Sequence, residues 1–114
     1  RGKVAVIDLW ASWCMPCRAK AKALILLYEK YKDRGFEIVG VAREFKNTDR
    51  VRQAIKQDGY PWLQLIELDD SRRIWTRYML GNAGGGVFLV DRDGTILAVN
   101  PKPEEVQSIL ERIL

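Results

Sequence analysis

The 114-residue sequence contains no histidine and only two cysteines, Cys14 and Cys17, and these shortages exclude several kinds of metal site. A structural zinc ion takes about four ligands, usually cysteine and histidine. One molecule of this chain cannot supply them without using carboxylates. Covalent haem attachment requires histidine directly after the second cysteine, where this chain has Arg18. We therefore expect no metal or haem, and nothing in the sequence implies a flavin or a nucleotide.

Long apolar runs and clustered charge are also missing. No stretch approaches the roughly 18 uninterrupted apolar residues of a membrane span, so we expect a domain that is not embedded in a membrane. The net charge is only +4, from 19 basic and 15 acidic residues spread along the chain. There is no basic run with interleaved aromatic residues, which argues against nucleic-acid binding.

The sequence opens on Arg1 rather than methionine and carries no signal peptide. We therefore expect a domain excised from a longer protein, whose own targeting stays open. The length suffices for one domain and is too short for two. Internal repeats, low-complexity segments and linkers are not found, so we expect one monomeric domain over residues 1–114.

Both cysteines lie in the segment 13–17, Trp-Cys-Met-Pro-Cys, between an apolar stretch of strand length and a segment that favours a helix. Two thiols three positions apart at a helix start can form and break a disulfide. The unpaired N–H groups and the partial positive charge of a helix N-terminus stabilise a thiolate and lower its pKa. Because the thiolate is the species that attacks disulfides, the spacing supplies both a nucleophile and its resolving partner. The motif predicts a redox site.

A purely structural disulfide is the simplest alternative. Closing a loop of four residues removes little entropy from the unfolded chain, about 2 kcal/mol compared with about 4.7 kcal/mol for a hundred-residue loop. The short spacing therefore favours thiol–disulfide chemistry over a purely stabilising cross-link.

Hydrophobic patterning and turn residues predict an alternation of strands and helices. We predict strands over 4–10, 36–41, 87–90 and 95–99. We predict helices over 16–34, from a cap at 47, 48 or 49 to 58, from caps at 69–71 to 80, and from 103 onward. The segment 62–68 reads as a short strand or an irregular apolar loop, residues 81–86 as a glycine-rich turn, and Asp93-Gly94 as a hairpin turn. The order β-α-β-α-α-β-β-α implies an α/β domain with a mixed sheet.

These segments resemble the thioredoxin fold, most closely the TlpA/ResA-like branch of bacterial thiol–disulfide oxidoreductases. Residues 2–18 match the active-site strand and turn of that family, whereas 59–62 and 87–96 match it more weakly. Together the matches cover nearly the whole chain. The resemblance implies a central mixed β-sheet flanked by helices on both faces, and the strand structure that usually precedes this point again suggests truncation.

The resemblance also implies roles for four residues. Cys14 would be the attacking cysteine and Cys17 the resolving one. Asp8 falls on the buried acidic position of thioredoxins, where the carboxylate exchanges a proton with the second cysteine. Burial in an apolar strand would raise its pKa, unless Asp8 caps another group or lies at an exposed strand end. Glu44 falls near an acidic position beside the cysteines of ResA-like proteins, or else is a solvated loop acid.

Substrate contacts are expected from residues around the cysteines. Trp13 would cover the pair, and Met15 and Pro16, between the cysteines, help to set the reduction potential. Met15 stands where glycine is commoner. Trp10 is expected to pack beneath the site and to have no functional role. In the following helix, Lys22 takes the usual place of a helix-kinking proline, so this helix should run straighter.

The facing loop departs most from the family pattern. Gly85 stands where the family has a cis-proline that faces the cysteines and aligns the substrate backbone. A cis bond before a non-proline residue costs about 2.5–4 kcal/mol, so we expect a trans Gly84–Gly85 bond. We expect Gly84 and Gly85 to form a more flexible substrate loop, with a loss of specificity.

The sequence thus predicts a thiol–disulfide oxidoreductase that exchanges electrons with protein disulfides or dithiols and with an upstream donor or acceptor. Family resemblance favours an extracytoplasmic, periplasmic bacterial setting, within a larger anchored protein. The rival interpretation is a thioredoxin-fold binding module whose cysteines merely oxidise, supported by the glycine turn at 84–86 and by Lys22. A thiol peroxidase is a weaker third, because nothing beyond the cysteine motif resembles a peroxide pocket.

Overall fold

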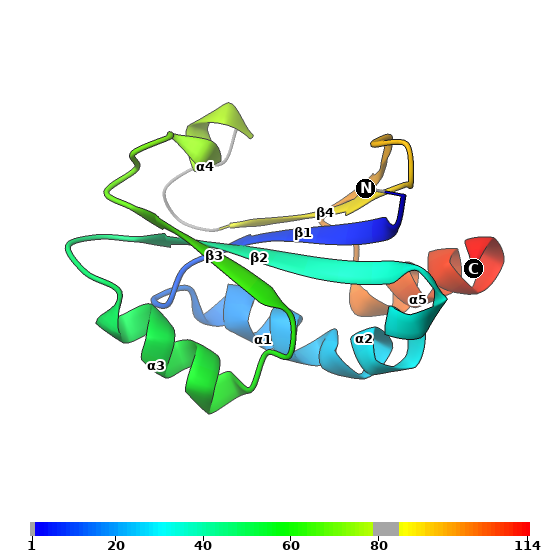
Figure 1. Ribbon diagram of the computed structural model, residues 1–114, viewed down its shortest axis with the longest axis horizontal. Helices are drawn as coiled ribbons and strands as arrows, with labels where there is room; N and C mark the ends of the chain where they lie inside the picture. The colour runs from blue at the N-terminus through cyan, green and yellow to red at the C-terminus, as the bar shows by residue number, and fades with distance from the viewer. Residues whose placement is uncertain (1, 79–84) are drawn as a thin grey trace.

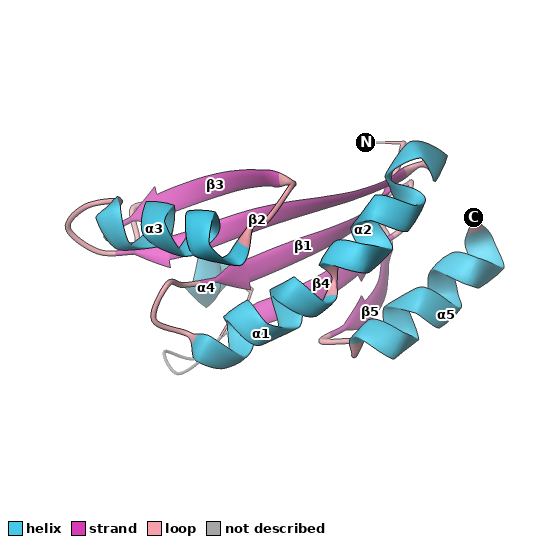
Figure 2. Cartoon of the chain, turned by 90° about the horizontal axis from the view of Figure 1, so that it is seen from below, coloured by secondary structure: helices cyan, strands magenta, loops and turns pink. Residues whose placement is uncertain are grey.

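The apolar stretch near the start of the chain forms β1 (Val4–Trp10), the central strand of a five-stranded sheet. The computed structural model describes residues 2–78 and 85–114 (Figure 1). Its strand order is β3-β2-β1-β4-β5 (Figure 2). β2 (Phe36–Glu44) runs parallel to β1, whereas β4 (Gly86–Val90) runs antiparallel to it. The sheet is therefore mixed, as predicted. Burial on both faces explains why β1 is almost continuously apolar.

Helices cover both faces of the sheet unequally. α1 (Met15–Ala23), α2 (Ile25–Tyr31), α3 (Asp49–Asp58) and α5 (Pro103–Ile113) lie on one face, and the short α4 (Ile74–Arg77) lies on the other (Figures 1 and 2). This arrangement confirms the predicted α/β fold class. Within the described ranges, no helix is long and apolar enough to cross a membrane.

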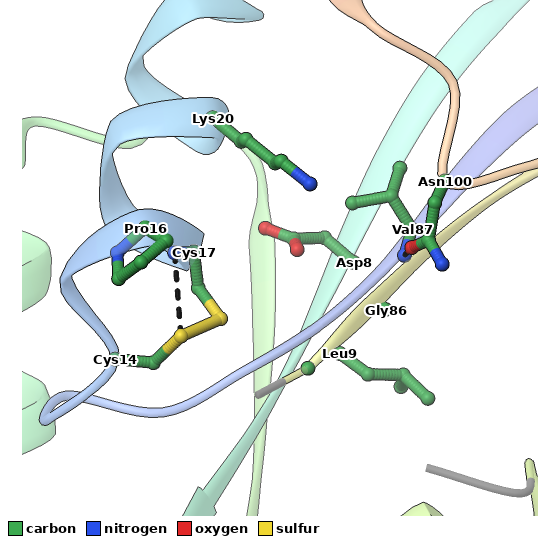
Figure 3. A pocket seen from close by; sticks show the side chains of 10 residues that line it. Asp8, Leu9, Cys14, Pro16, Cys17, Lys20, Gly86, Val87 and Asn100 are labelled. Atoms are coloured by element: carbon green, nitrogen blue, oxygen red, sulfur yellow. Dashed lines mark hydrogen bonds between the residues drawn. A yellow bond between two sulfur atoms is a disulfide. The ribbon is translucent and has the colours of Figure 1, made fainter. Parts of the chain in front are cut away.

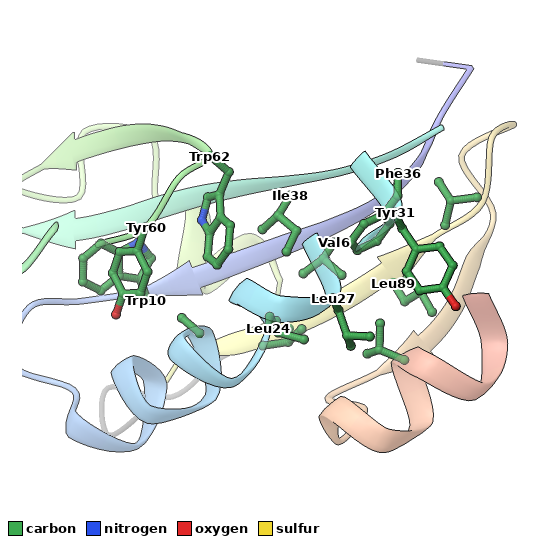
Figure 4. Close-up of a cluster of buried hydrophobic side chains, with 14 of the residues drawn as sticks. Val6, Trp10, Leu24, Leu27, Tyr31, Phe36, Ile38, Tyr60, Trp62 and Leu89 are labelled. Atoms are coloured by element: carbon green, nitrogen blue, oxygen red, sulfur yellow. The ribbon is translucent and has the colours of Figure 1, made fainter. Parts of the chain in front are cut away.

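Alternation along β1 divides its side chains between two hydrophobic cores. Val6 and Trp10 belong to the larger core, between the sheet and the four helices (Figure 4). Leu9 packs in the smaller core with Trp75 of α4. Because Asp8 alternates with Leu9, its side chain lies on the face that α1 covers.

The segment 16–34, predicted as one helix, is divided at Leu24. The Leu24 N–H donates to the carbonyl of Ala21 at 3.0 Å, which tightens the last turn of α1, and α2 begins at the next residue. A 3₁₀ turn (Lys32–Arg34) then leads to Gly35. The expectation of a straighter helix without the proline is therefore wrong. The physical reason is that the bond from Leu24 to Ala21 spans three residues instead of four, which interrupts the α-helical ladder.

Two other segments differ from their predictions. The stretch left open at 62–68 forms the edge strand β3 (Leu63–Leu68), parallel to β2. The caps proposed at 69–71 do not begin α4, whose N-cap is Arg73 in a left-handed conformation with φ of 51°. Asp70 binds the Arg43 guanidinium through two hydrogen bonds of 2.6 Å instead. Residues 79 and 80 of the predicted helix lie outside the described ranges.

The C-terminal third follows the sequence prediction closely. β4 and β5 (Ile96–Val99) form the hairpin expected around Asp93-Gly94. The Asp91 N–H donates to the Thr95 carbonyl at 2.7 Å, and Gly94 adopts a left-handed φ of 93°, which glycine does without strain. α5 begins at Pro103 as predicted and packs on the larger core.

Candidate active site

The two cysteines form a disulfide at the start of α1 (Figure 3). Cys14 is the N-cap, with an extended backbone at φ −90° and ψ 93°, and Cys17 lies in the first helical turn. The Cys17 N–H points at Cys14 Sγ, 3.3 Å away. The Cys14 sulfur thus occupies the capping position, where the free N–H groups and the positive end of the helix would stabilise a thiolate.

Exposure runs against the assignment of Cys14 as the nucleophile, because Cys17 is the more exposed of the two cysteines. Cys14 is only 6% exposed, whereas Cys17 is partly buried. The capping geometry, and not accessibility, is therefore the structural feature that favours Cys14 as the nucleophile.

Asp8 lies in a pocket of about 180 Å³ that the disulfide also lines (Figure 3). Its side chain is 2% exposed, so the alternative of an exposed strand end is excluded. Burial raises the pKa of Asp8 to about 7, and the nearby Lys20 ammonium acts in the opposite direction. Its Oδ2 has no hydrogen-bond partner among residues 2–78 and 85–114. This is a carboxyl group that can take up or release a proton near neutral pH.

Gly85 lies against β1, opposite the disulfide. A Cβ at this position would overlap the Leu9 carbonyl oxygen and would lie 3.2 Å from Cys17 Sγ. The backbone therefore approaches so closely that only glycine fits, and a proline there would clash. Gly84 and the Gly84–Gly85 bond lie outside the described residues.

Glu44, at the end of β2, is buried and is not a solvated loop acid. Its two carboxylate oxygens accept hydrogen bonds from the N–H and the hydroxyl of Ser12, both at 2.7 Å. Ser12 precedes the cysteine motif in the turn between β1 and α1. Glu44 therefore anchors the turn that carries the cysteines. Sequence reasoning missed Ser12, although a serine two residues before Cys14 was a signal for such an anchor.

Arg18 provides a second anchor that sequence reasoning missed. Its guanidinium makes hydrogen bonds of 2.7 and 3.0 Å to Asp58 at the end of α3, and one of 3.3 Å to the Ser12 carbonyl. Arg18 holds the pKa of Asp58 below its usual value, and the Tyr60 hydroxyl also donates to Asp58, at 2.7 Å. Forty positions separate Arg18 from Asp58, so no local pattern could have linked them.

Aromatic side chains surround the exposed edge of the site. Trp13 is 42% exposed and stacks on Phe45 with ring centroids 5.5 Å apart. Trp75 lies 6.3 Å from Trp13 on its buried side. Trp13 is thus accessible beside Cys14, as a substrate contact requires, and Met15 is exposed too. Trp10 is fully buried in the larger core, as expected.

A metal site is not found in the part of the chain that the structure describes: no three histidine, cysteine, aspartate or glutamate side chains there are grouped so as to hold an ion. The described site presents two sulfurs and the carboxyl group of Asp8 in one pocket.

This sheet order, with a cysteine pair at the start of the helix after the central strand, defines a thioredoxin-like domain of the thiol–disulfide oxidoreductase class. The chain belongs to the AhpC/TSA family, which it matches over residues 1–99.

Curated relatives include proteins named thiol-disulfide oxidoreductase ResA. One from Bacillus cereus is 27% identical over 116 aligned residues, covering 99% of this chain and 65% of its own length. The one from Bacillus anthracis is 31% identical over 98 residues, covering 85% of this chain and 54% of its own. These matches confirm the ResA-like resemblance. The chain spans between 54% and 65% of the length of these two relatives.

Solved structures agree with the fold. The thioredoxin domain of a thiol-disulfide oxidoreductase from Bacteroides vulgatus has a TM-score of 0.86 and 27% identity, over 98% of this chain and 79% of that one. A thiol:disulfide interchange protein from Bacteroides sp. has a TM-score of 0.83 and 28% identity, over 97% and 72%. Both proteins carry names of the class that the site of this chain defines.

Proposed function

We propose that this domain exchanges electrons between its own cysteine pair and disulfides or dithiols of other proteins. The observation that carries the proposal is the disulfide at the start of α1, in which Cys14 Sγ faces the N–H of Cys17. After reduction, a sulfur in that position is stabilised as a thiolate, which is the form that attacks disulfides. No cofactor beyond this disulfide is part of the proposal.

Reduction of a substrate proceeds in two displacement steps. The Cys14 thiolate attacks one sulfur of the substrate disulfide, a mixed disulfide forms, and the other substrate sulfur leaves as a thiolate. The Cys17 thiol then gives its proton to Asp8 and attacks Cys14 Sγ. This releases the second substrate sulfur as a thiolate and restores the Cys14–Cys17 disulfide. Two electrons pass to the substrate, an upstream dithiol donor returns them, and the reverse sequence oxidises a dithiol.

Asp8 is suited to the proton transfer because its pKa of about 7 keeps both protonation states populated near neutrality. A binding module would gain nothing from a carboxyl group buried beneath a disulfide, since burying it unpaired destabilises the fold. Asp8 therefore favours the oxidoreductase over the binding module.

Glu44 has a different role in this proposal from the catalytic one that the sequence suggested. Both of its oxygens are bound to Ser12, so we infer that it positions the turn carrying Trp13 and Cys14. Trp13, Met15 and Pro16 contact the substrate around the sulfurs, and Gly85 contributes its backbone opposite them.

The proposed setting is extracytoplasmic and bacterial, with this domain acting as a monomeric part of a longer, anchored protein. Bacterial relatives longer than this chain support the proposal. One protein of the same fold, from Mycobacterium tuberculosis, is described as a secreted disulfide oxidoreductase.

The test is a measurement of the reduction potential against glutathione, paired with an assay of insulin disulfide reduction. We expect a defined two-electron potential and measurable turnover, both lost in Cys14→Ser. In Cys17→Ser, Cys14 should accumulate a mixed disulfide with the substrate, because the resolving thiol is missing. A wild-type protein inactive with every disulfide and dithiol tested would overturn the proposal and leave the binding module.

A further inference from the structure

The side chain of Gln64, on β3, lies over the neighbouring strand β2, on the side of Asp8. The sheet register pairs Asp8 with Gly40, and Gly40 with Gln64, so the three residues form one row across β1, β2 and β3. A Cβ at Gly40 would overlap Gln64 Oε1 and would lie 2.7 Å from its Nε2. The amide of Gln64 therefore lies directly over Gly40. Paired residues of neighbouring strands point to the same face, which is the face of Asp8.

Trp10 holds this amide in one orientation. The indole Nε1–H of Trp10 donates to Gln64 Oε1 at 2.9 Å. An indole can only donate, so it identifies the bonded amide atom as the oxygen. Trp10 is itself fully buried and contacts the Tyr60 ring edge-on at 5.3 Å. The two N–H groups of Gln64 Nε2 are therefore left for another partner.

In this row, a buried donor and a buried acceptor have no partner in the part of the chain that the structure describes. Gln64 Nε2 is buried and has no hydrogen-bond partner within residues 2–78 and 85–114, and the same holds for Asp8 Oδ2. Buried polar groups in folded proteins are almost always paired, directly or through a buried water molecule. Their chemistry is complementary, because an amide N–H donates and a carboxylate accepts.

We propose that Gln64 is a positioning residue for Asp8, whose carboxylate it supports through one water molecule shared between Nε2 and Oδ2. The inference rests on the proposed function, in which Asp8 takes the proton of Cys17. A donor facing the carboxylate stabilises its charged form. Gln64 would thus oppose the rise in the pKa of Asp8 that burial causes, so that Asp8 can still ionise near neutral pH.

Other groups also face Asp8, and their effects on its pKa have to be distinguished from the effect of Gln64. Lys20 approaches from α1 and favours the charged carboxylate (Figure 3). The Tyr60 hydroxyl also interacts electrostatically with Asp8, but its hydrogen bond is donated to Asp58. The disulfide lines the same pocket and carries no charge. The test therefore keeps these groups unchanged and alters only the amide.

The test compares Gln64→Met with wild type in the oxidised protein, by following the Asp8 carboxyl carbon in NMR titrations. Methionine keeps the length of the side chain and removes both N–H donors. We expect the pKa of Asp8 to rise by about one unit, a scale typical of a lost hydrogen bond to a charged group. Gln64→Glu should raise it at least as much, because it brings a second carboxyl group into the row.

Trp62→Phe is the matched control, since it removes from the same core another buried N–H group that has no partner among the described residues. It should leave the pKa of Asp8 unchanged. An unchanged pKa in both folded Gln64 variants, or an equal shift in Trp62→Phe, would overturn the inference. The titration needs no turnover, so it separates the two proposals. A shifted pKa in a protein without disulfide-reducing activity would reject only the proposed function.

Discussion

At the scale of single residues, the chemistry of this site depends on where two groups are placed. Asp8 is an ordinary carboxylic acid whose pKa is raised because the larger core and α1 remove it from water. Cys14 is an ordinary thiol whose sulfur lies at the N-cap of α1. In each case the surroundings decide which protonation state is favoured.

Asp8→Asn tests the cost of this burial. The pKa of Asp8 is 3.8 in the reference state and about 7 in the folded one, so the folded state binds the proton more tightly. The contribution of Asp8 protonation to the unfolding free energy is fully present below about pH 4 and is lost as the pH rises through about 7. Asp8→Asn should therefore gain up to about 4 kcal/mol in unfolding free energy at pH 8 and almost nothing at pH 4. Urea unfolding across this range measures the difference, and a gain independent of pH would contradict burial of the carboxylate as its cause.

The same variant should resolve mixed disulfides more slowly, while the attack by Cys14 is less affected. The measurement is the single-turnover rate of each step between pH 6 and pH 8. Wild-type rates of insulin reduction throughout that range would show that Asp8 takes no part in catalysis.

The reduced cysteines should differ in reactivity. The N-cap position should lower the pKa of Cys14 below the value of about 8.5 for a free thiol, whereas Cys17 should react slowly. Alkylation rates of Cys17→Ser and Cys14→Ser between pH 5 and pH 9 measure the two thiols separately. Equal rates across this range would count against the assigned roles.

At the scale of elements, three segments meet at the disulfide. β1 carries Asp8, the start of α1 carries both sulfurs, and β4 begins beside Gly85. Glu44, at the end of β2, holds the intervening turn through Ser12. The geometry of the site therefore depends on close backbone packing around the sulfurs as well as on the reactive side chains.

Gly85→Pro tests the approach of this segment to β1. Because any Cβ would overlap the Leu9 carbonyl oxygen, we expect a loss of about 1–3 kcal/mol in stability, where a compatible proline would add about 0.4–1 kcal/mol. Gly94→Asn is the control, since its turn has open space and asparagine tolerates a left-handed backbone. Thermal unfolding of both variants checks this, and a more stable Gly85→Pro protein would contradict the structure around Leu9.

Glu44 can be tested as a positioning residue with two substitutions. Glu44→Leu leaves the Ser12 N–H and hydroxyl without partners, so we expect a loss of about 1–3 kcal/mol in stability. Glu44→Gln retains an acceptor for the N–H and should keep most of the insulin-reducing activity. If Glu44→Gln is folded but inactive, the carboxylate has a catalytic part after all.

At the scale of the whole molecule, β1 joins the two cores, because its side chains alternate between them. Trp10 and Trp62 report on the larger core, and Trp75 reports on the smaller one. We expect both cores to unfold in one transition, as small single domains usually do. Superimposable curves from tryptophan fluorescence and far-UV circular dichroism would bear this out. Two separated transitions would contradict a single domain over 1–114.

Local sequence was enough to predict several parts of this protein. The apolar stretch at 4–10 specified a strand buried on both faces, and Asp93-Gly94 specified the hairpin turn. The spacing of Cys14 and Cys17 indicated their chemistry. These features depend on residues close together in the chain, where side-chain pattern, turn propensity and helix capping act.

Tertiary structure decided the rest. The Ser12 partner of Glu44 and the Arg18–Asp58 pair depend on groups that folding brings together. Gly85 shows most clearly what sequence alone could not predict. Its lack of a side chain suggested a flexible loop, whereas in the structure its backbone lies against Leu9. Close packing excludes volume around each atom, and that constraint exists only after distant segments have met.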